Sequence, residues 1–129
     1  MKKKILIVIA NYYEDISKGL ISSAKKELKS NIIKTSIIYV PGVFEIPITI
    51  KKNIKKYDGF IALGCVIRGQ TPHFDFISKS TTDAIILLSI EHTKPIANGI
   101  LTCLNKNQAI KRKSKGKEAA IALKSVLSQ

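Results

Sequence analysis

The chain has 129 residues, of which 45% are hydrophobic, and its mean hydropathy is +0.10. This length and composition predict one globular domain, residues 1–129, and exclude a disordered chain or a multidomain enzyme. The net charge of +13 suggests nucleic-acid binding, but the 22 basic residues include only two arginines, Arg68 and Arg112, and there is no tryptophan. Because nucleic-acid sites concentrate arginine and aromatic residues, the charge favours small phosphorylated molecules as ligands, and we expect no specific nucleic-acid partner.

Cysteine usage and hydropathy indicate where the chain works. Cys65 and Cys103 are isolated thiols in apolar segments, so we expect both to be buried and reduced and the protein to be cytoplasmic. The basic residues 2–4 followed by an apolar run resemble a signal peptide, but the run ends at Asn11 without a cleavage site, which favours a buried strand. No segment approaches the roughly 20 apolar residues that cross a bilayer, so no membrane association is expected.

Apolar periodicity predicts strands and helices in alternation. Four segments are predicted strands: 4–10, 35–40, 60–67 and 96–102. The runs 4–10 and 60–67 are almost continuously apolar, which is the pattern of strands covered on both faces. Apolar residues recur at helical spacing in the sequence after each strand: 15–30, from 46 onward, 72–91, and 105–127 with a break near 114–116. Pro47 is tolerable only in the first turn of the second helix.

The repeating unit is therefore a strand followed by a helix. Four such units predict an α/β fold, a three-layer sandwich in which a four-stranded parallel sheet carries helices on both faces, with right-handed crossovers. In such sheets ligands bind beyond the carboxyl ends of the strands. Four segments reach that edge: 11–12, 43–45, 68–73 and 103–105.

One histidine follows a turn that is suited to anions. Gly64 closes an apolar run, and Thr71-Pro72 reads as an N-cap followed by proline at the first helical position, which puts His73 in the first helical turn. Free backbone N–H groups and the helix dipole favour an anion there and disfavour a charged imidazole. A neutral His73 that transfers protons beside a phosphate is one hypothesis, and a surface or capping histidine is the alternative.

Other common chemistries lack their motifs. Neither a dinucleotide fingerprint nor a P-loop is present, and His73 and His92 have no acidic cluster to complete a metal site. No serine or cysteine has the setting of a hydrolase nucleophile. What remains is an edge pocket with one imidazole, the Glu45 carboxylate and an aromatic wall of Tyr12 and Phe44, which suits a planar substrate and a phosphate. A core position for Phe44 and a helix-start role for Glu45 are alternatives.

Four motifs in order resemble those of the 6,7-dimethyl-8-ribityllumazine synthase family over nearly the whole chain. They are VPGVFEIP at 40–47, LGCVIRGQTPHFDF at 63–76, NGILT at 98–102 with Gln108-Ala109 through Arg112, and Lys115-Gly116 with Glu118-Ala119-Ala120. The resemblance implies a flavodoxin-like fold and a transferase that needs no cofactor and no metal. It would condense 5-amino-6-(D-ribitylamino)uracil with 3,4-dihydroxy-2-butanone 4-phosphate to 6,7-dimethyl-8-ribityllumazine, releasing phosphate and water, in the penultimate step of riboflavin biosynthesis.

The resemblance also implies roles for individual residues. His73 matches the family's proton-transfer residue. Two sets of residues would hold the substrates: Tyr12, Val43, Phe44, Glu45, Cys65, Val66, Ile67 and Asn98 for the pyrimidine and its ribityl chain, and Gln70, Thr71, Arg112 and Lys115 for the butanone phosphate. The family's site lies between adjacent subunits of a homopentamer, so we expect Asn98 and Arg112 to come from the neighbour. Riboflavin synthase is a candidate partner.

The chain departs from the family pattern at several positions. Asn11 replaces the usual arginine before the stacking aromatic, Asn98 stands where phenylalanine is common, Lys111 replaces an acidic residue and Ser114 an asparagine. The chain begins at its first strand, without the N-terminal extension that accompanies capsid-like assembly in some members, so we expect a free pentamer. A non-catalytic relative that binds a lumazine or flavin is the alternative, against which the retained proton-transfer and phosphate residues argue.

Overall fold

In the computed structural model, which describes residues 2–69 and 73–129, a four-stranded parallel sheet has the strand order β2-β1-β3-β4. The strands are β1 (Lys3–Ala10), β2 (Ile33–Val40), β3 (Gly59–Ile67) and β4 (Ile96–Cys103). The helical elements are α1 (Glu14–Leu28), the 3₁₀ turn η1 (Val43–Glu45), α2 (Ile46–Lys52), α3 (His73–His92), α4 (Lys106–Lys111) and α5 (Lys115–Leu127). The predicted α/β fold is confirmed, including Pro47 in the first turn of α2.

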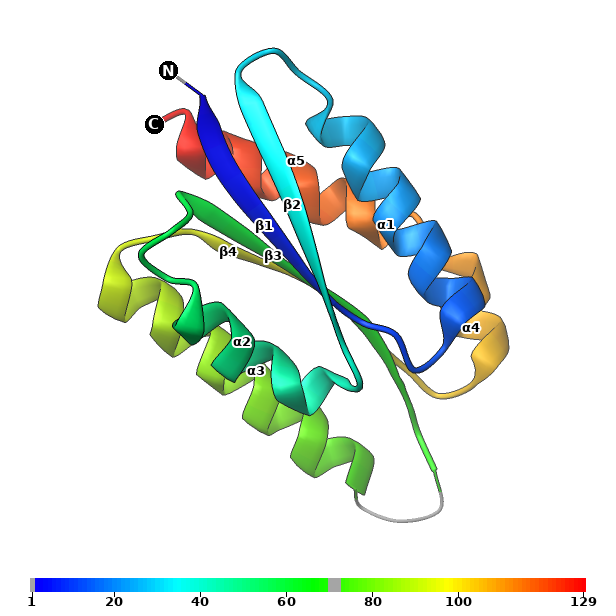
Figure 1. The fold of residues 1–129 in the computed structure, drawn as a ribbon. Helices are drawn as coiled ribbons and strands as arrows, with labels where there is room; N and C mark the ends of the chain where they lie inside the picture. Colours follow the sequence, from blue (N-terminus) through cyan, green and yellow to red (C-terminus); the bar gives the residue numbers. More distant parts are fainter. Residues whose placement is uncertain (1, 70–72) are drawn as a thin grey trace.

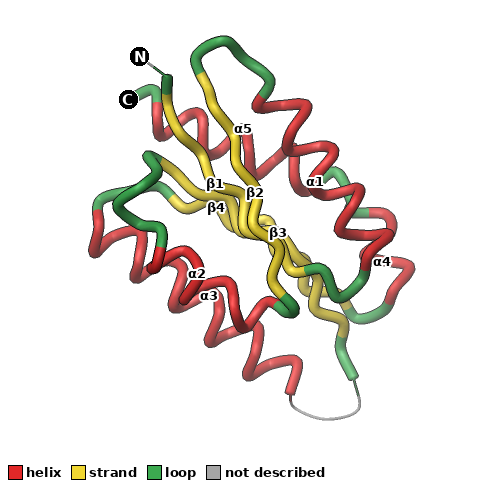
Figure 2. The backbone as a smooth tube through the Cα atoms, in the orientation of Figure 1, coloured by secondary structure: helices red, strands yellow, loops and turns green. Residues whose placement is uncertain are grey.

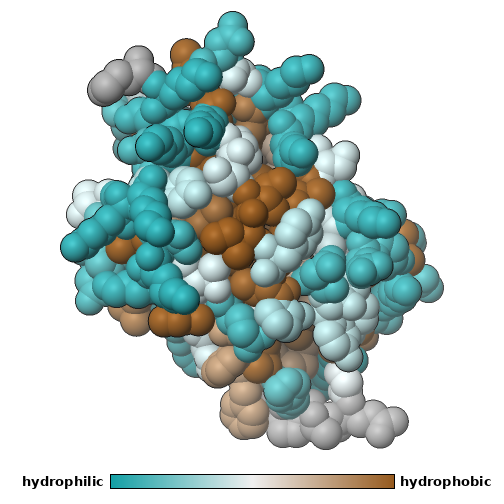
Figure 3. All heavy atoms as spheres, in the orientation of Figure 1, coloured by the Kyte–Doolittle hydropathy of each residue, from teal (hydrophilic) through white to brown (hydrophobic). Residues whose placement is uncertain are grey.

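Helices cover both faces of the sheet, so the fold has three layers with the sheet in the middle (Figures 1 and 2). One layer contains α1, α4 and α5, and the other contains η1, α2 and α3. In the space-filling view, hydrophilic side chains dominate the outer surface of both helix layers, and an apolar strip runs between them (Figure 3). No helix in the described ranges is long and apolar enough to span a membrane.

The core is divided by the sheet, and β1 contributes to both halves. Successive side chains of a strand point to opposite faces, so Ile5, Ile7 and Ile9 pack beneath α1 and α5. Leu6 and Val8 pack on the other side with residues of α2 and α3. Because neighbours cover β1 on both faces and along both edges, each of these five side chains is fully buried. Burial of one such side chain contributes about 1.5–3 kcal/mol.

The break in the last helical region lies slightly earlier in the chain than the predicted position near 114–116. It lies at 112–114, and Gly116 is inside the first turn of α5. There α5 crosses α1 so closely that a Cβ on Gly116 would collide with the carbonyl oxygen of Leu20 and lie 2.7 Å from Ser23 Oγ. Ser23 Oγ also donates to the carbonyl of Lys113 at 3.2 Å, which ties α1 to the residues just before α5. Gly116 therefore permits the close packing of α5 on α1 and does not mark a break between helices.

We expect Gly116→Ala to reduce the free energy of unfolding by about 1–3 kcal/mol, because the added methyl group must push α5 away from α1. Gly69→Ala is the matched control, since a Cβ at Gly69 meets no atom of the described residues within 4 Å. Both Gly→Ala substitutions lower the conformational entropy of the unfolded chain by about the same amount. Urea unfolding followed by circular dichroism measures the difference, and equal stability of the two variants would contradict the packing role of Gly116.

Candidate active site

A cavity of about 310 Å³ lies at the carboxyl edge of the sheet. Its walls come from the turn after β1, from η1, from the end of β3 and from the start of α3. The lining residues are Tyr12, Tyr13, Gly42, Val43, Phe44, Cys65, Val66, Ile67, His73 and Ile77. The cavity thus brings together seven of the residues that the sequence predicts for substrate binding and proton transfer. We call it the edge pocket.

A close approach at Gly64 places η1 over this edge. The strands β1 and β3 pair directly, with Ile9 opposite Leu63, so their carboxyl ends leave the sheet side by side. A Cβ on Gly64 would lie 2.8 Å from Val43 Cγ1 and 3.1 Å from Ala10 Cβ. The first of these distances is closer than real Cβ atoms approach other atoms, and the second is unusually tight. The bare backbone at Gly64 therefore lets Val43 pack onto both strands and brings the rest of η1 to the pocket.

Two aromatic rings stand at the pocket with most of their surface uncovered. Tyr12 is 74% exposed and Phe44 is 61% exposed. The alternative of a core position for Phe44 is therefore wrong. Both rings are available to stack on a flat ligand, and such a contact is worth about 0.5–1.5 kcal/mol beyond the area that it buries.

Tyr13 lines the same pocket, and sequence reasoning missed its role there. The ring centroids of Tyr12 and Tyr13 lie 4.9 Å apart with an interplanar angle of 80°, an edge-to-face contact. The available signal was its position beside Tyr12 directly after a buried strand. Gly42 and Ile77 are further lining residues that the sequence did not single out.

The predicted polar groups differ in how they relate to the pocket. His73 is the first residue of α3, is exposed, and lines the pocket. Glu45 is half-buried and is not a lining residue; its Oε1 lies beside Gly42, within 3.2 Å of where a Cβ would be. Glu45 is the N-cap residue of α2, as the helix-start alternative expects, but its side chain makes no cap hydrogen bond to that helix. Gln70 and Thr71 lie outside the described residues.

The other predicted residues lie elsewhere in the chain. Arg112 and Lys115 line a second cavity of about 360 Å³ beside β4, together with Thr102, Ser114 and Glu118 among others. We call it the cationic cavity. Asn98 is exposed on β4, where its Oδ1 accepts a hydrogen bond from the Ile100 N–H at 2.9 Å, and it lines neither cavity. Within a single chain, the predicted site residues therefore do not all lie together.

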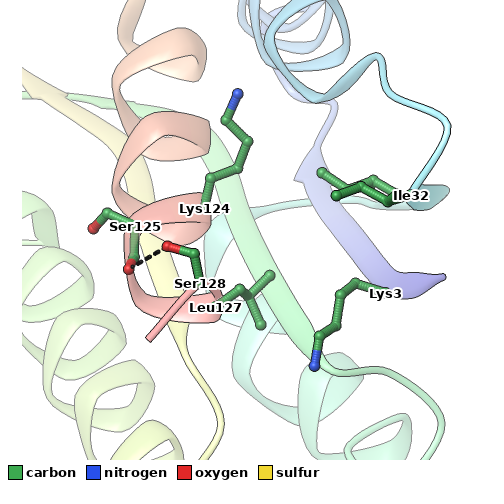
Figure 4. A pocket seen from close by; sticks show the side chains of 7 residues that line it. Lys3, Ile32, Lys124, Ser125, Leu127 and Ser128 are labelled. Atoms are coloured by element: carbon green, nitrogen blue, oxygen red, sulfur yellow. Dashed lines mark hydrogen bonds between the residues drawn. The ribbon is translucent and has the colours of Figure 1, made fainter. Parts of the chain in front are cut away.

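A larger cavity of about 550 Å³ lies at the amino edge of the sheet, between the starts of β1 and β2 and the end of α5 (Figure 4). Its titratable groups are Lys3 and Lys124, and Lys124 Nζ is held by Glu27 Oε2 at 2.7 Å. It contains none of the predicted site residues. Size alone therefore does not identify the site. Across the described ranges, no group of three or more His, Cys, Asp and Glu residues is arranged to hold a metal ion.

Cys65 forms part of the pocket wall as a neutral thiol. Burial, and then the neighbouring Cys103, raises the pKa of the Cys65 thiol to about 12. Since the thiolate is the nucleophile, Cys65 offers an apolar surface at neutral pH and no reactive sulfur. Both cysteines are free and buried, as the sequence predicts.

The family model described as 6,7-dimethyl-8-ribityllumazine synthase matches residues 2–129. Several curated proteins of that name are similar to the chain. The Bartonella tribocorum protein is 42% identical over 132 residues, covering 95% of this chain and 87% of the relative. The Agrobacterium fabrum protein is 40% identical, and the match covers 90% of this chain and 85% of the relative. The Corynebacterium kroppenstedtii protein is 36% identical, and the match covers 92% of this chain and 79% of the relative.

The raised pKa of Cys65 predicts slow thiol labelling of the folded protein. At pH 8 a thiol with a pKa near 12 carries about 1000-fold less thiolate than one with a pKa near 9. The pKa is raised, so reactivity grows only as the pH rises toward 12 or when the chain unfolds. In Cys103→Ala the largest cause of the raised pKa, burial, remains, so an aromatic disulfide reagent at pH 8 should still react slowly with Cys65 in buffer and at once in denaturant. Fast labelling of the folded variant would contradict the prediction.

Proposed function

The chain belongs to the 6,7-dimethyl-8-ribityllumazine synthase family, and we propose that it makes 6,7-dimethyl-8-ribityllumazine at the edge pocket. It is a transferase of riboflavin biosynthesis that condenses 5-amino-6-(D-ribitylamino)uracil with 3,4-dihydroxy-2-butanone 4-phosphate and releases phosphate and water. The observation that supports this placement best is the gathering of Tyr12, Phe44 and His73 on one pocket.

The pyrimidine substrate fits the aromatic and apolar part of the pocket. Tyr12 provides an exposed face for the ring, and residues 65–67 line its edge with backbone and apolar side chains. The ribityl chain runs along Val43, Phe44 and Glu45, where the carboxylate accepts hydrogen bonds from its hydroxyl groups. This arrangement holds the amine of the pyrimidine toward the second substrate.

His73 supplies acid–base catalysis. Its imidazole lies at the pocket, and a histidine can accept and donate a proton near neutral pH. Condensation of the amine with the ketone, loss of phosphate and ring closure each move protons between the two substrates. His73 assists these transfers, while the pocket contributes by holding the substrates together.

The phosphate of the ketone needs cations, and these lie outside the edge pocket in a single chain. We therefore place Arg112, Lys115 and Asn98 on a neighbouring copy within a homopentamer, where they complete the site. Gln70 and Thr71 are the proposed phosphate contacts from the same chain as His73. Exposed aliphatic residues on α3 support such an assembly: Ile86, Leu87 and Ile90 are 53%, 64% and 71% exposed, an apolar surface that a monomer would leave in water.

We also propose a domain organisation, a cellular compartment and a partner for the chain. Residues 1–129 form one lumazine synthase domain. The protein works in the cytoplasm, where its two free cysteines stay reduced. Riboflavin synthase is the proposed partner.

We expect the purified protein to form the lumazine from both substrates well above the spontaneous rate, with absorbance and fluorescence as the readout. His73→Ala should lower kcat by roughly 10- to 100-fold and leave residual activity, because positioning persists. Arg112→Ala should raise the KM for the butanone phosphate about 10-fold with little change in kcat, since it removes a charged hydrogen-bond donor.

Two substitutions serve as controls. His92→Ala changes the histidine at the other end of α3, where its Nε2 lies 2.8 Å from Lys51 Nζ, and should leave kcat unchanged. Lys117→Ala removes an exposed cation in the first turn of α5, outside the cationic cavity, and should leave KM unchanged. Product at only the spontaneous rate would favour a non-catalytic lumazine-binding relative. Weak pyrimidine binding by His73→Ala with normal kcat would refute its proton-transfer role.

Native mass spectrometry should give the mass of five chains. Leu87→Lys should dissociate the assembly and abolish activity while the circular dichroism spectrum is retained, because it puts a charge into the proposed interface. Ile121→Lys is the matched control, since Ile121 is an exposed aliphatic residue on α5 in the other helix layer, and its variant should remain assembled. An active monomer would refute the shared site.

A further inference from the structure

The backbone of Tyr13 is fixed where β1 passes into α1. Tyr13 is the residue that precedes the first turn of α1, and its carbonyl accepts a hydrogen bond from the Ser17 N–H at 2.9 Å. The buried Ser17 Oγ in turn donates to the carbonyl of Ala10, the last residue of β1, at 2.9 Å. These two bonds join the end of the strand to the start of the helix. The direction in which Tyr13 leaves the backbone is therefore set by regular structure.

The ring of Tyr13 is held as well as its backbone. It packs against the buried cluster beneath α1 and α5, and it also lines the edge pocket. Burial, and then the neighbours Tyr12 and Cys65, raises the pKa of its phenol above the usual value. The side chain is therefore a neutral, partly buried ring that also borders the pocket.

In contrast to the ring of Tyr13, the ring of Tyr12 is mostly in solvent. Tyr12 is 74% exposed, and its ring makes an edge-to-face contact with the Tyr13 ring at a centroid distance of 4.9 Å and an interplanar angle of 80°. An exposed tyrosine without such a contact exchanges among several rotamers, and a ligand that needs one of them loses affinity in proportion to its population. An edge-to-face pair favours one rotamer over the others by about 2- to 12-fold in population.

We propose that Tyr13 is a positioning residue, whose fixed ring holds Tyr12 in the orientation that stacks on the pyrimidine. This inference rests on the proposed function, because Tyr12 has a stacking role only if the edge pocket binds that ring. Tyr13 acts through Tyr12, so the ring of Tyr13 matters for the effect and its hydroxyl group does not. This separates the proposal from a purely structural tyrosine and from one that hydrogen-bonds the substrate.

The test measures binding of 6,7-dimethyl-8-ribityllumazine by fluorescence titration, separately from catalysis. Tyr13→Leu should weaken binding about 3- to 10-fold, and Tyr13→Phe, which keeps the ring, should stay within about twofold of the wild type. Tyr57→Leu is the matched control. It breaks another edge-to-face pair, that of Tyr57 and Phe60 at 6.0 Å and 66°, away from the pocket, and should leave binding unchanged.

A double-mutant cycle shows whether Tyr13 acts through Tyr12. In a Tyr12→Leu background, Tyr13→Leu should weaken binding by no more than about twofold. If Tyr13→Leu is too unstable to purify, Tyr13→Met fills the space with an unbranched chain and carries the same expectation.

Three results would overturn the inference: unchanged binding in Tyr13→Leu, an equal loss in Tyr13→Phe, or a full additional loss in the Tyr12→Leu background. A wild-type protein that neither binds the lumazine nor forms it would instead refute the proposed function. The two failures are therefore distinguishable.

Discussion

The edge pocket depends on the contact that Gly64 permits between η1 and the two central strands. Val43 occupies the space that a side chain at Gly64 would need, and it belongs to the same buried cluster as Ala10 at the end of β1. Phe44 is therefore brought to the pocket by the residue before it, which is fixed in the core. Because packed interiors cannot yield by more than a few tenths of an ångström, any larger residue at 64 would move the whole wall.

Much of this arrangement is predictable from sequence, because the signals are local and regular. Continuous apolar runs identify buried strands, and strand–helix alternation requires a parallel sheet with one ligand-binding edge. Tyr12, Val43 and His73 each come within a few residues after a strand in the sequence, so their meeting at that edge follows from topology alone. The neutral, buried state of Cys65 likewise follows from its apolar strand.

Other features depend on three-dimensional relations that have no local signal. Adjacent tyrosines read alike in sequence, yet one ring is exposed and its neighbour packs on the core, because the turn into α1 directs them differently. Gly116 reads as a helix break, and only the crossing with α1 reveals its packing role. The separation of Arg112 from the edge pocket also depends on where α4 and α5 settle beside β4.

That separation has a physical advantage for a reaction that joins a flat ring to a phosphorylated ketone. A stacking surface works best where water is easily displaced, whereas a buried cation costs several kcal/mol unless it is paired. Arg112 is exposed in the single chain and keeps its hydration, while Tyr12 and Phe44 offer apolar faces elsewhere. In the proposed assembly the two surfaces would meet across a subunit boundary, and the substrate phosphate would supply the paired charge. The pocket can then remain apolar without a permanently buried, unpaired cation.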